Sequence, residues 1–198
     1  MFEPREIADD ILLRTVQTTD ALAIATALAQ NRAYLAPWEP VRPEAYFTES
    51  WWTTELLRAT RALGQEAELP LVLEDLRGGS GSRVDADPGT IARNTSVVGR
   101  FTLGSISRGP FQSAGLGYWV VESHAGRGLA SATVQAIVAD ARDRLGLHRI
   151  EAGTLPDNAG SQRVLAKAGF ERIGYAPRYL SINGTWQDHV LFQRILEH

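Results

Sequence analysis

The chain has 198 residues, of which 22% are charged, and its formal net charge is −3. This length predicts one domain, and the complete absence of cysteine excludes disulfides, zinc–thiolate sites, iron–sulfur clusters and a cysteine nucleophile. The mild negative charge argues against a protein that coats nucleic acid.

The N-terminus, MFEPREIADD, is acidic and lacks the apolar core of a secretory signal. The longest apolar runs, such as ALAIATALA at 21–29, have about half the length that a membrane-spanning helix needs. The four histidines are scattered, which predicts no histidine-built metal site. We therefore expect a cytoplasmic protein with no metal and no membrane association.

The first part of the chain alternates strand and helix signals. Thr19 and Asp20 offer N-caps for a first helix, three prolines within 34–43 indicate a loop, and Gly64 ends a second helical stretch. In chain order we expect a strand at 11–16, a helix from 20 to about 33, a loop at 34–43, a helix at 44–63 and a strand at 68–76.

Residues 77–94 contain the run GGSGSRVDADPG, which indicates either a long hairpin loop or a disordered insertion. We favour a flexible loop, because neither side of it carries a complete pattern of its own. The prediction is a single domain over 1–198.

The second part predicts two adjacent strands, then a helix, a strand, a helix and a hairpin. Asn183-Gly184 between two extended runs is a strong signal for a type I′ turn. The expected elements are strands at 96–107 and 114–122, a helix that starts at 126–128 and ends at 145–146, a strand at 147–155, a helix at 158–168, and strand segments at 170–177, 179–182 and 185–196. This order predicts an α+β (mixed α/β) fold.

The stretch GYWVVESHAGRGLASATV is the most informative, because a strand leads through a glycine turn into a helix. Gly126 and Gly128 let a ligand approach the backbone, and the free amides and dipole of the helix start favour an anion. Arg127 adds positive charge. Physically this is a phosphate cradle, although a plain compact turn would explain the glycines equally well. It is neither the nucleotide P-loop nor the dinucleotide fingerprint.

A second constellation, LPDNAGSQRVLAKAGF, follows about thirty residues later. Asn158, Ser161 and Leu165 fall at helical spacing. Taken alone, Asn158 is a helix cap and Ser161 a solvated serine. Together with the cradle, the pair becomes specific.

The chain resembles the GNAT acyl-CoA N-acetyltransferases, and within them the RimJ/RimL group of ribosomal-protein-alanine N-acetyltransferases. The resemblance covers nearly the whole chain. It is carried by NRAYLAPWEP, GYWVVESHAGRGLA, LGLHRIEAGTLPDNAGSQRVLAKAGF and YLSINGTWQDHVL, of which the last two are the most specific. The family cradle, Gln/Arg-x-x-Gly-x-Gly/Ala, here begins with Ala125. The cradle binds mainly through backbone amides, so this departure matters little.

The resemblance implies a central, mostly antiparallel mixed sheet that splays at a cofactor cleft, with about four flanking helices. It also implies acetyl-CoA as acetyl donor. The pantetheine arm would pair with the backbone around Val120 and Val121, Asn158 would bond the pantetheine or a water, and Ser161 would protonate the departing thiolate. The pyrophosphate would lie on the amides of Gly126, Arg127, Gly128, Leu129, Ala130 and Ser131.

The implied reaction is direct attack of a neutral amine on the thioester. A free strand N–H near Val120 or Val121 could polarise the carbonyl. Some RimL-type enzymes place a glutamate in the tail hairpin where this chain has Leu180. The replacement bases are Glu122, at the end of the splayed strand, and Glu39, in the PWEP loop. A surface carboxylate is the alternative explanation for each.

Aromatic residues at 34–52 lie in the region that walls the acceptor groove in this family. Tyr34 and Trp38 are the substrate-wall candidates, whereas core packing fits Trp51 or Trp52 better. His189 could be catalytic, although a satisfied structural histidine fits the pattern better.

A terminal α-amine has a pKa of roughly 7.7–8.0 against about 10.4 for lysine, so deprotonating lysine costs about 3 kcal/mol more. A site without a strong base therefore suits an α-amine. The leading hypothesis is acetylation of a protein N-terminus, such as that of a ribosomal protein. Acetylation of a small-molecule amine and a non-catalytic acetyl-CoA-binding module are the alternatives. We expect a monomer or homodimer that does not bind nucleic acid.

Overall fold

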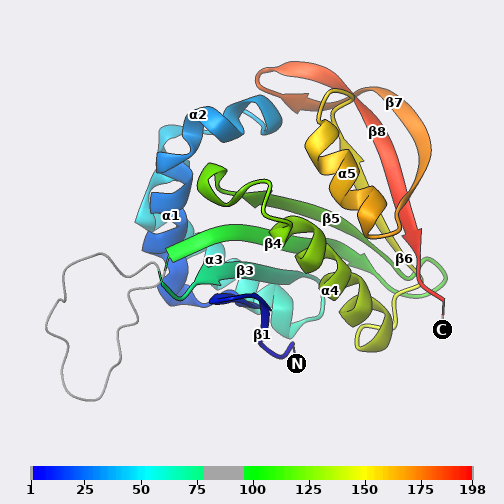
Figure 1. Ribbon diagram of the computed structural model, residues 1–198, viewed down its shortest axis with the longest axis horizontal. Coiled ribbons are helices and arrows are strands. Elements are labelled where there is room, and N and C mark those ends of the chain that lie inside the picture. The colour runs from blue at the N-terminus through cyan, green and yellow to red at the C-terminus, as the bar shows by residue number, and fades with distance from the viewer. Residues whose placement is uncertain (1, 78–95, 198) are drawn as a thin grey trace, which may run out of the picture.

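The computed structural model describes residues 2–77 and 96–197 (Figure 1). Eight strands form one sheet in the order β1-β2-β3-β4-β5-β6-β8-β7, in which only β5 and β6 run parallel. The strands are β1 Arg5–Ala8, β2 Ile11–Thr15, β3 Leu69–Asp75, β4 Ser96–Ser107, β5 Ser113–Val120, β6 Arg149–Thr154, β7 Glu171–Ile182 and β8 Thr185–Ile195. The helices are α1 Ala21–Gln30, α2 Arg32–Leu35, α3 Glu49–Gly64, α4 Leu129–Asp143 and α5 Ala159–Lys167.

The predicted fold class is confirmed: the sheet is mixed and mostly antiparallel, with four long helices and the single turn α2. The predicted loop at 77–94 lies, apart from Arg77, outside the described residues. The strand β1 was not predicted, because REIA at a sheet edge buries none of its four residues fully.

Three predicted boundaries were wrong for local reasons. The first helix breaks at Asn31, whose side chain donates to the carbonyl of Ala27 and leaves the helical conformation. The predicted loop at 34–43 begins instead with the end of α2 and a 3-10 turn at Ala36–Trp38. Another 3-10 turn, Glu44–Phe47, precedes α3, whose N-cap is Thr48.

The tail differs from the prediction because one strand replaces two. A bulge between Ala176 and Leu180 absorbs Pro177 and the left-handed Arg178, at φ 49°, so that β7 continues across both predicted segments. The Asn183-Gly184 turn joins β7 to β8 as predicted, with positive φ at both residues.

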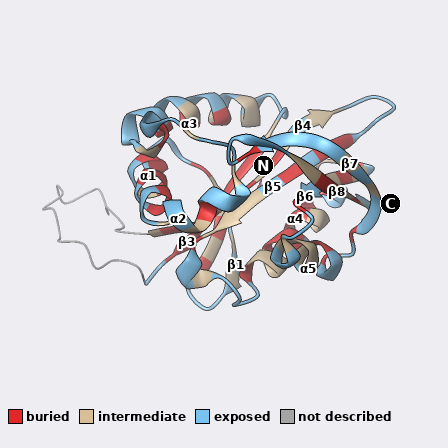
Figure 2. Cartoon of the chain, turned by 90° about the horizontal axis from the view of Figure 1, so that it is seen from above, coloured by how far each residue is buried: buried red, intermediate tan, exposed pale blue. Residues whose placement is uncertain are grey.

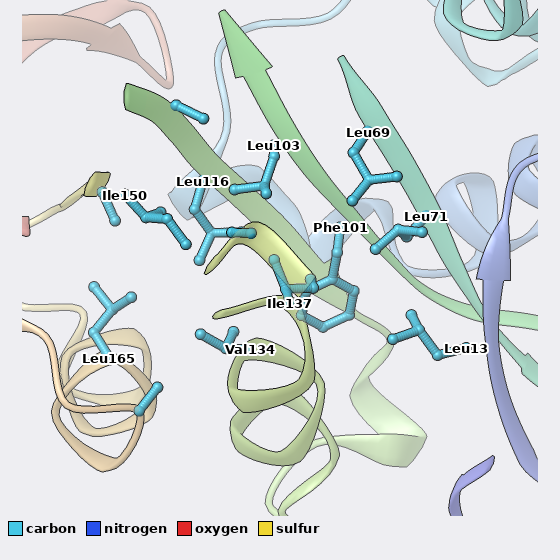
Figure 3. Packing of buried hydrophobic residues seen from close by; sticks show 14 of the residues in the cluster. Leu13, Leu69, Leu71, Phe101, Leu103, Leu116, Val134, Ile137, Ile150 and Leu165 are labelled. Atoms are coloured by element: carbon cyan, nitrogen blue, oxygen red, sulfur yellow. The ribbon is translucent and has the colours of Figure 1, made fainter. Parts of the chain in front are cut away.

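The sheet lies between two helical layers (Figure 2). On one face α1 and α3 pack on the sheet through residues such as Ile24, Trp52 and Val72. On the other face α4 and α5 cover a larger core, in which Ile137 of α4 lies next to Phe101, whereas Leu165 of α5 lies farther away, beyond Val134 (Figure 3). β3 is buried along its whole length because it is covered on both faces.

The sheet divides between β5 and β6. These strands pair only at Ser113–Arg149, Ala114–Ile150 and Gly115–Glu151, near the start of each. Beyond Gly115, β5 continues to pair with β4, and β6 continues to pair with β8. The edge of β5 from residue 116 to 120 therefore faces a wedge-shaped gap between the two halves.

A buried ion cluster holds the first helix on the sheet. Arg14 of β2 places Nη2 2.7 Å from Asp20 and Nε 2.6 Å from Glu74, and both acidic side chains are less than a tenth exposed. We expect Arg14→Met to lower the free energy of unfolding by about 3 kcal/mol, because it removes the cation that neutralises two buried carboxylates.

Urea unfolding would measure this loss. The matched control is Arg142→Met, because Arg142 forms an ion pair with Asp143 on the surface and such pairs contribute little. Equal unfolding midpoints for the two variants would contradict a stabilising role for the Arg14 cluster.

Candidate active site

A cavity of about 670 Å³ extends from the start of α4, past the gap between β5 and β6, to the β7–β8 hairpin. It brings together most of the predicted site residues. The lining does not include Val121, Glu122 or Arg127. It does include the other predicted residues, which are Tyr34, Trp38, Glu39, Val120, Gly126, Gly128, Leu129, Ala130, Ser131, Asn158 and Ser161.

The glycine turn before α4 forms one end of the cavity. Gly126 and Gly128 have φ of +74° and +82°, a conformation that side-chain-bearing residues rarely adopt, and a Cβ atom on either would point into open space. Gly128 caps α4 without a side-chain hydrogen bond, and the first amide bonded back to it is that of Ala132. The amides that precede Ala132 in α4 thus have no partner within the helix and favour an anion.

The splayed edge of β5 supplies a backbone donor. The amide of Val121 donates to the carbonyl of Val98 on β4, at 2.9 Å, so it is not free. Amides alternate along a strand, so that of Val120 points the other way, toward the gap. Of the two predicted candidates, Val121 is thus the one whose amide is already bonded to β4. Glu122 follows in a 3-10 turn, and its amide donates to the side chain of Asn31.

Asn158 and Ser161 are held together at the start of α5. The Asn158 side chain is the N-cap of the helix and accepts from the Ser161 amide at 3.0 Å, as predicted from the sequence. The Ser161 hydroxyl lies 2.8 Å from the phenol oxygen of Tyr118, which comes from β5 and also lines the cavity. Burial raises the pKa of Tyr118 to about 12, and the bond to Ser161 offsets this only in part.

Glu39 is the only carboxylate in the cavity lining, as far as the described residues show. Burial raises the pKa of its side chain, and the positive charges of Arg42 and Arg100 offset this only in part. Arg42 Nε lies 3.8 Å from Glu39 Oε2. The Glu39 carbonyl accepts from the amide of Asn183, which ties the PWEP loop to the tip of the β7–β8 hairpin.

The wall around Glu39 is mainly aromatic and apolar. Tyr34 and Trp38 lie in the cavity lining, as does Leu180 in the tail hairpin. Trp52 is a core residue, as predicted, and donates from its indole to the carbonyl of Tyr46. Core packing was wrong for Trp51, which is 41% exposed.

His189 is only 3% exposed and also lines the cavity. Its Nδ1 lies 3.1 Å from the carbonyl of Gln187, and its ring packs against Tyr179. His189 thus has the hydrogen-bond partner expected of a structural histidine at Nδ1, while its ring also forms part of the cavity wall.

The polar lining residues that sequence reasoning missed include Tyr118, His124 and Thr154. Tyr118 could have been flagged by period-2 alternation, because it shares a strand face with Leu116. His124 bonds Asp75 at the end of β3 and so anchors the turn before the cradle. Thr154 has a buried hydroxyl with no hydrogen-bond partner among the described residues, and no local signal marks it.

Residues 2–77 and 96–197 contain no cluster of three or more His, Asp or Glu side chains that could hold a metal ion. In the same ranges, no helix combines the length and the apolar character needed to cross a membrane.

Three features together define an N-acetyltransferase fold. They are the splayed sheet, the glycine cradle at the N-terminus of α4, and the cavity that joins this cradle to the aromatic wall around Glu39. A family model described as the acetyltransferase (GNAT) domain matches residues 10–171. The chain belongs to this family and is an N-acetyltransferase.

Relatives cover nearly the full length of the chain. The [ribosomal protein uS5]-alanine N-acetyltransferase of Escherichia coli is 33% identical over 94% of this chain and 88% of its own. Among solved structures, ribosomal-protein-S5-alanine acetyltransferase from Vibrio fischeri matches with a TM-score of 0.87 and 30% identity, covering 99% and 98% of the two chains. Mycobacterium smegmatis RimJ, solved with CoA-disulfide, matches with a TM-score of 0.78 and 29% identity over 93% and 81%.

Proposed function

We propose that the protein transfers the acetyl group of acetyl-CoA to the N-terminal α-amine of a protein, a ribosomal protein being the leading candidate. The observation that carries this proposal is the continuous cavity that joins the phosphate cradle to an aromatic end, where Glu39 is the one carboxylate among the described lining residues. The Escherichia coli relative is named for an alanine of ribosomal protein uS5. The cytoplasm, where ribosomes work, is the proposed location.

The chain's residues suit CoA at the cradle end. The amides from Gly126 to Ser131 would hold the pyrophosphate, and Arg127, although outside the lining, adds charge nearby. The edge of β5 at Val120 would pair with the amide-bearing pantetheine arm in the manner of an added strand. Asn158 keeps its side-chain NH₂ group for that arm or for a water, because its oxygen caps α5.

Each residue near the gap has a different role in the acetyl transfer. The amide of Val120 polarises the thioester carbonyl, where negative charge develops during attack. Ser161 gives a proton to the departing sulfur. Glu39 accepts the proton that the attacking amine loses, and Tyr34 and Trp38 wall the acceptor. Glu122 is the weaker candidate for the base, because its side chain is outside the cavity lining.

The base assignment predicts a change in the pH dependence. Glu39→Gln should lower kcat/KM about tenfold, a modest loss, because an α-amine with a pKa near 8 is already partly neutral at neutral pH. Burial raises the Glu39 pKa, so the wild-type acidic limb should lie above the ordinary glutamate value of about 4.3. Activity rises with pH through that limb as the carboxylate forms, and the variant should lack it.

A pH–rate profile of kcat/KM would measure this, with Glu122→Gln compared in parallel. A larger loss in Glu122→Gln would reassign the base. A raised carboxyl pKa means that ionised Glu39 destabilises the fold above that pKa. The Glu39→Gln protein should therefore be at least as heat-stable as the wild type at neutral pH, which separates lost chemistry from lost folding.

The acceptor class is tested by a thiol-release screen with acetyl-CoA. Peptides that start with Ala, Ser or Met would be compared with the same peptides blocked at the α-amine and with small amines. Release with free peptides alone supports the proposal. Preferential release with small amines would indicate a small-molecule acetyltransferase, and tight acetyl-CoA binding without release on any amine would indicate a binding module. The chain has no cysteine to contribute background thiol.

A further inference from the structure

The phenol of Tyr118 lies against the residue proposed as the proton donor. Its oxygen is 2.8 Å from Ser161 Oγ and 3.4 Å from the Ser161 carbonyl oxygen. The Tyr118 ring stacks on Phe101 of β4, with centroids 5.3 Å apart and planes 10° from parallel. Phe101 is fully buried, so the ring that presents the phenol is fixed by the core.

The direction of this hydrogen bond decides what Ser161 can do. A serine hydroxyl has one proton to donate and can accept from another donor. The Tyr118 pKa of about 12 keeps the phenol protonated at neutral pH. Its one proton has two acceptors within reach, the Ser161 carbonyl oxygen at 3.4 Å and Ser161 Oγ at 2.8 Å, and we assign it to the nearer Oγ. With its oxygen occupied in this way, Ser161 retains its own proton for a second partner in the cavity.

We propose that Tyr118 is a positioning residue for acetyl transfer, which orients the Ser161 hydroxyl so that its proton points at the CoA sulfur. This inference rests on the proposed function. Asn158 holds the backbone of Ser161 from one side, and Tyr118 holds its side chain from the other. The serine hydroxyl would otherwise rotate among three staggered positions.

The transfer step balances without a proton from Tyr118. The amine nitrogen bonds to the acetyl carbon, the carbon–sulfur bond breaks, and its electron pair stays on sulfur. Ser161 Oγ passes its proton to the sulfur, Glu39 takes the one proton that the neutral amine nitrogen loses, and that proton returns to Ser161 through solvent, so one proton moves in total from nitrogen to sulfur. In the proposed step the proton that reaches the sulfur comes from Ser161, so Tyr118 keeps its own proton and acts by orientation.

The kinetic test uses Tyr118→Phe, which removes the hydroxyl and keeps the stacked ring. We expect kcat to fall about tenfold, as for the loss of one hydrogen bond, and KM for acetyl-CoA to stay within about twofold. In a Ser161→Ala background the same change should have no further effect, because Tyr118 acts through Ser161. The control is Tyr175→Phe, which removes an exposed phenol bonded to Asp188 and should leave kcat unchanged.

A second readout needs no acceptor and separates this inference from the proposed function. Ultraviolet absorbance would follow the ionisation of the CoA thiol when CoA is bound to each protein. The bound thiol should titrate about half a unit to one unit higher in Tyr118→Phe and in Ser161→Ala than in the wild type, because each variant loses the aimed proton.

Equal thiol titration in wild type and Tyr118→Phe, or losses in kcat that multiply fully in the double variant, would overturn the role of Tyr118. Absence of turnover on every amine would overturn the proposed function instead, and the thiol titration would then still decide about Tyr118.

Discussion

Ser161→Ala should lower kcat by about 100-fold to 10,000-fold, the range expected when a positioned proton donor is removed. KM for acetyl-CoA should change little, because the alanine keeps the backbone amide that donates to Asn158 and so keeps the cap of α5. The lost group is a hydroxyl that acts on the sulfur only as the carbon–sulfur bond breaks. The interaction is therefore made in the transition state, and its loss lowers kcat and kcat/KM together.

Steady-state kinetics with varied acetyl-CoA would measure both constants. Ser181→Ala is the matched control, since Ser181 is an exposed serine of β7 outside the cavity lining. If Ser161→Ala turned over at the wild-type rate, Ser161 would not be the acid, and Tyr118 would have no donor to orient.

Gly128→Trp should weaken acetyl-CoA binding by at least 100-fold. The Cβ atom at this position points into open space at the cradle end of the cavity, so the indole would occupy the volume proposed for the pyrophosphate. It would also cover the amides at the start of α4. Isothermal titration with acetyl-CoA would measure the dissociation constant directly, without an acceptor.

Gly146→Trp controls for the strain of the first change. Gly146 lies just beyond the other end of α4, also has positive φ, at +59°, and also has nothing near its Cβ position. Both variants therefore bear a similar conformational cost, about 1–2 kcal/mol, and only one fills the cavity. Similar affinities in the two variants would remove the cradle assignment.

The parts of the site that were predictable are those encoded within a few neighbouring residues. Gly126 and Gly128 sit directly between a strand and a helix, and the Asn158 cap lies three residues before Ser161. In such local patterns, the neighbouring residues by themselves determine the local backbone structure. The order of strands and helices followed from the same kind of signal, apart from β1, which buries too little apolar surface to show an alternation.

The missing parts depend on contacts between distant segments. Tyr118 meets Ser161 across 43 residues, and this contact requires the divergence of β5 from β6. Glu39 reaches the cavity because the PWEP loop is bonded to Asn183 in the far hairpin. The spacing of residues in the sequence predicts neither of these contacts. The choice between Glu39 and Glu122 therefore required the three-dimensional structure.

The short pairing of β5 with β6 makes the sheet two platforms joined at one end. Three residue pairs connect them directly, and beyond these the gap contains backbone groups without a strand partner. A pantetheine arm lying there would act as a temporary strand. The free energy of CoA binding would then add to the stability of the folded β6–β8–β7 half of the sheet. In that case the donor substrate would also brace the structure, and the enzyme would be more rigid with CoA bound than after CoA has left.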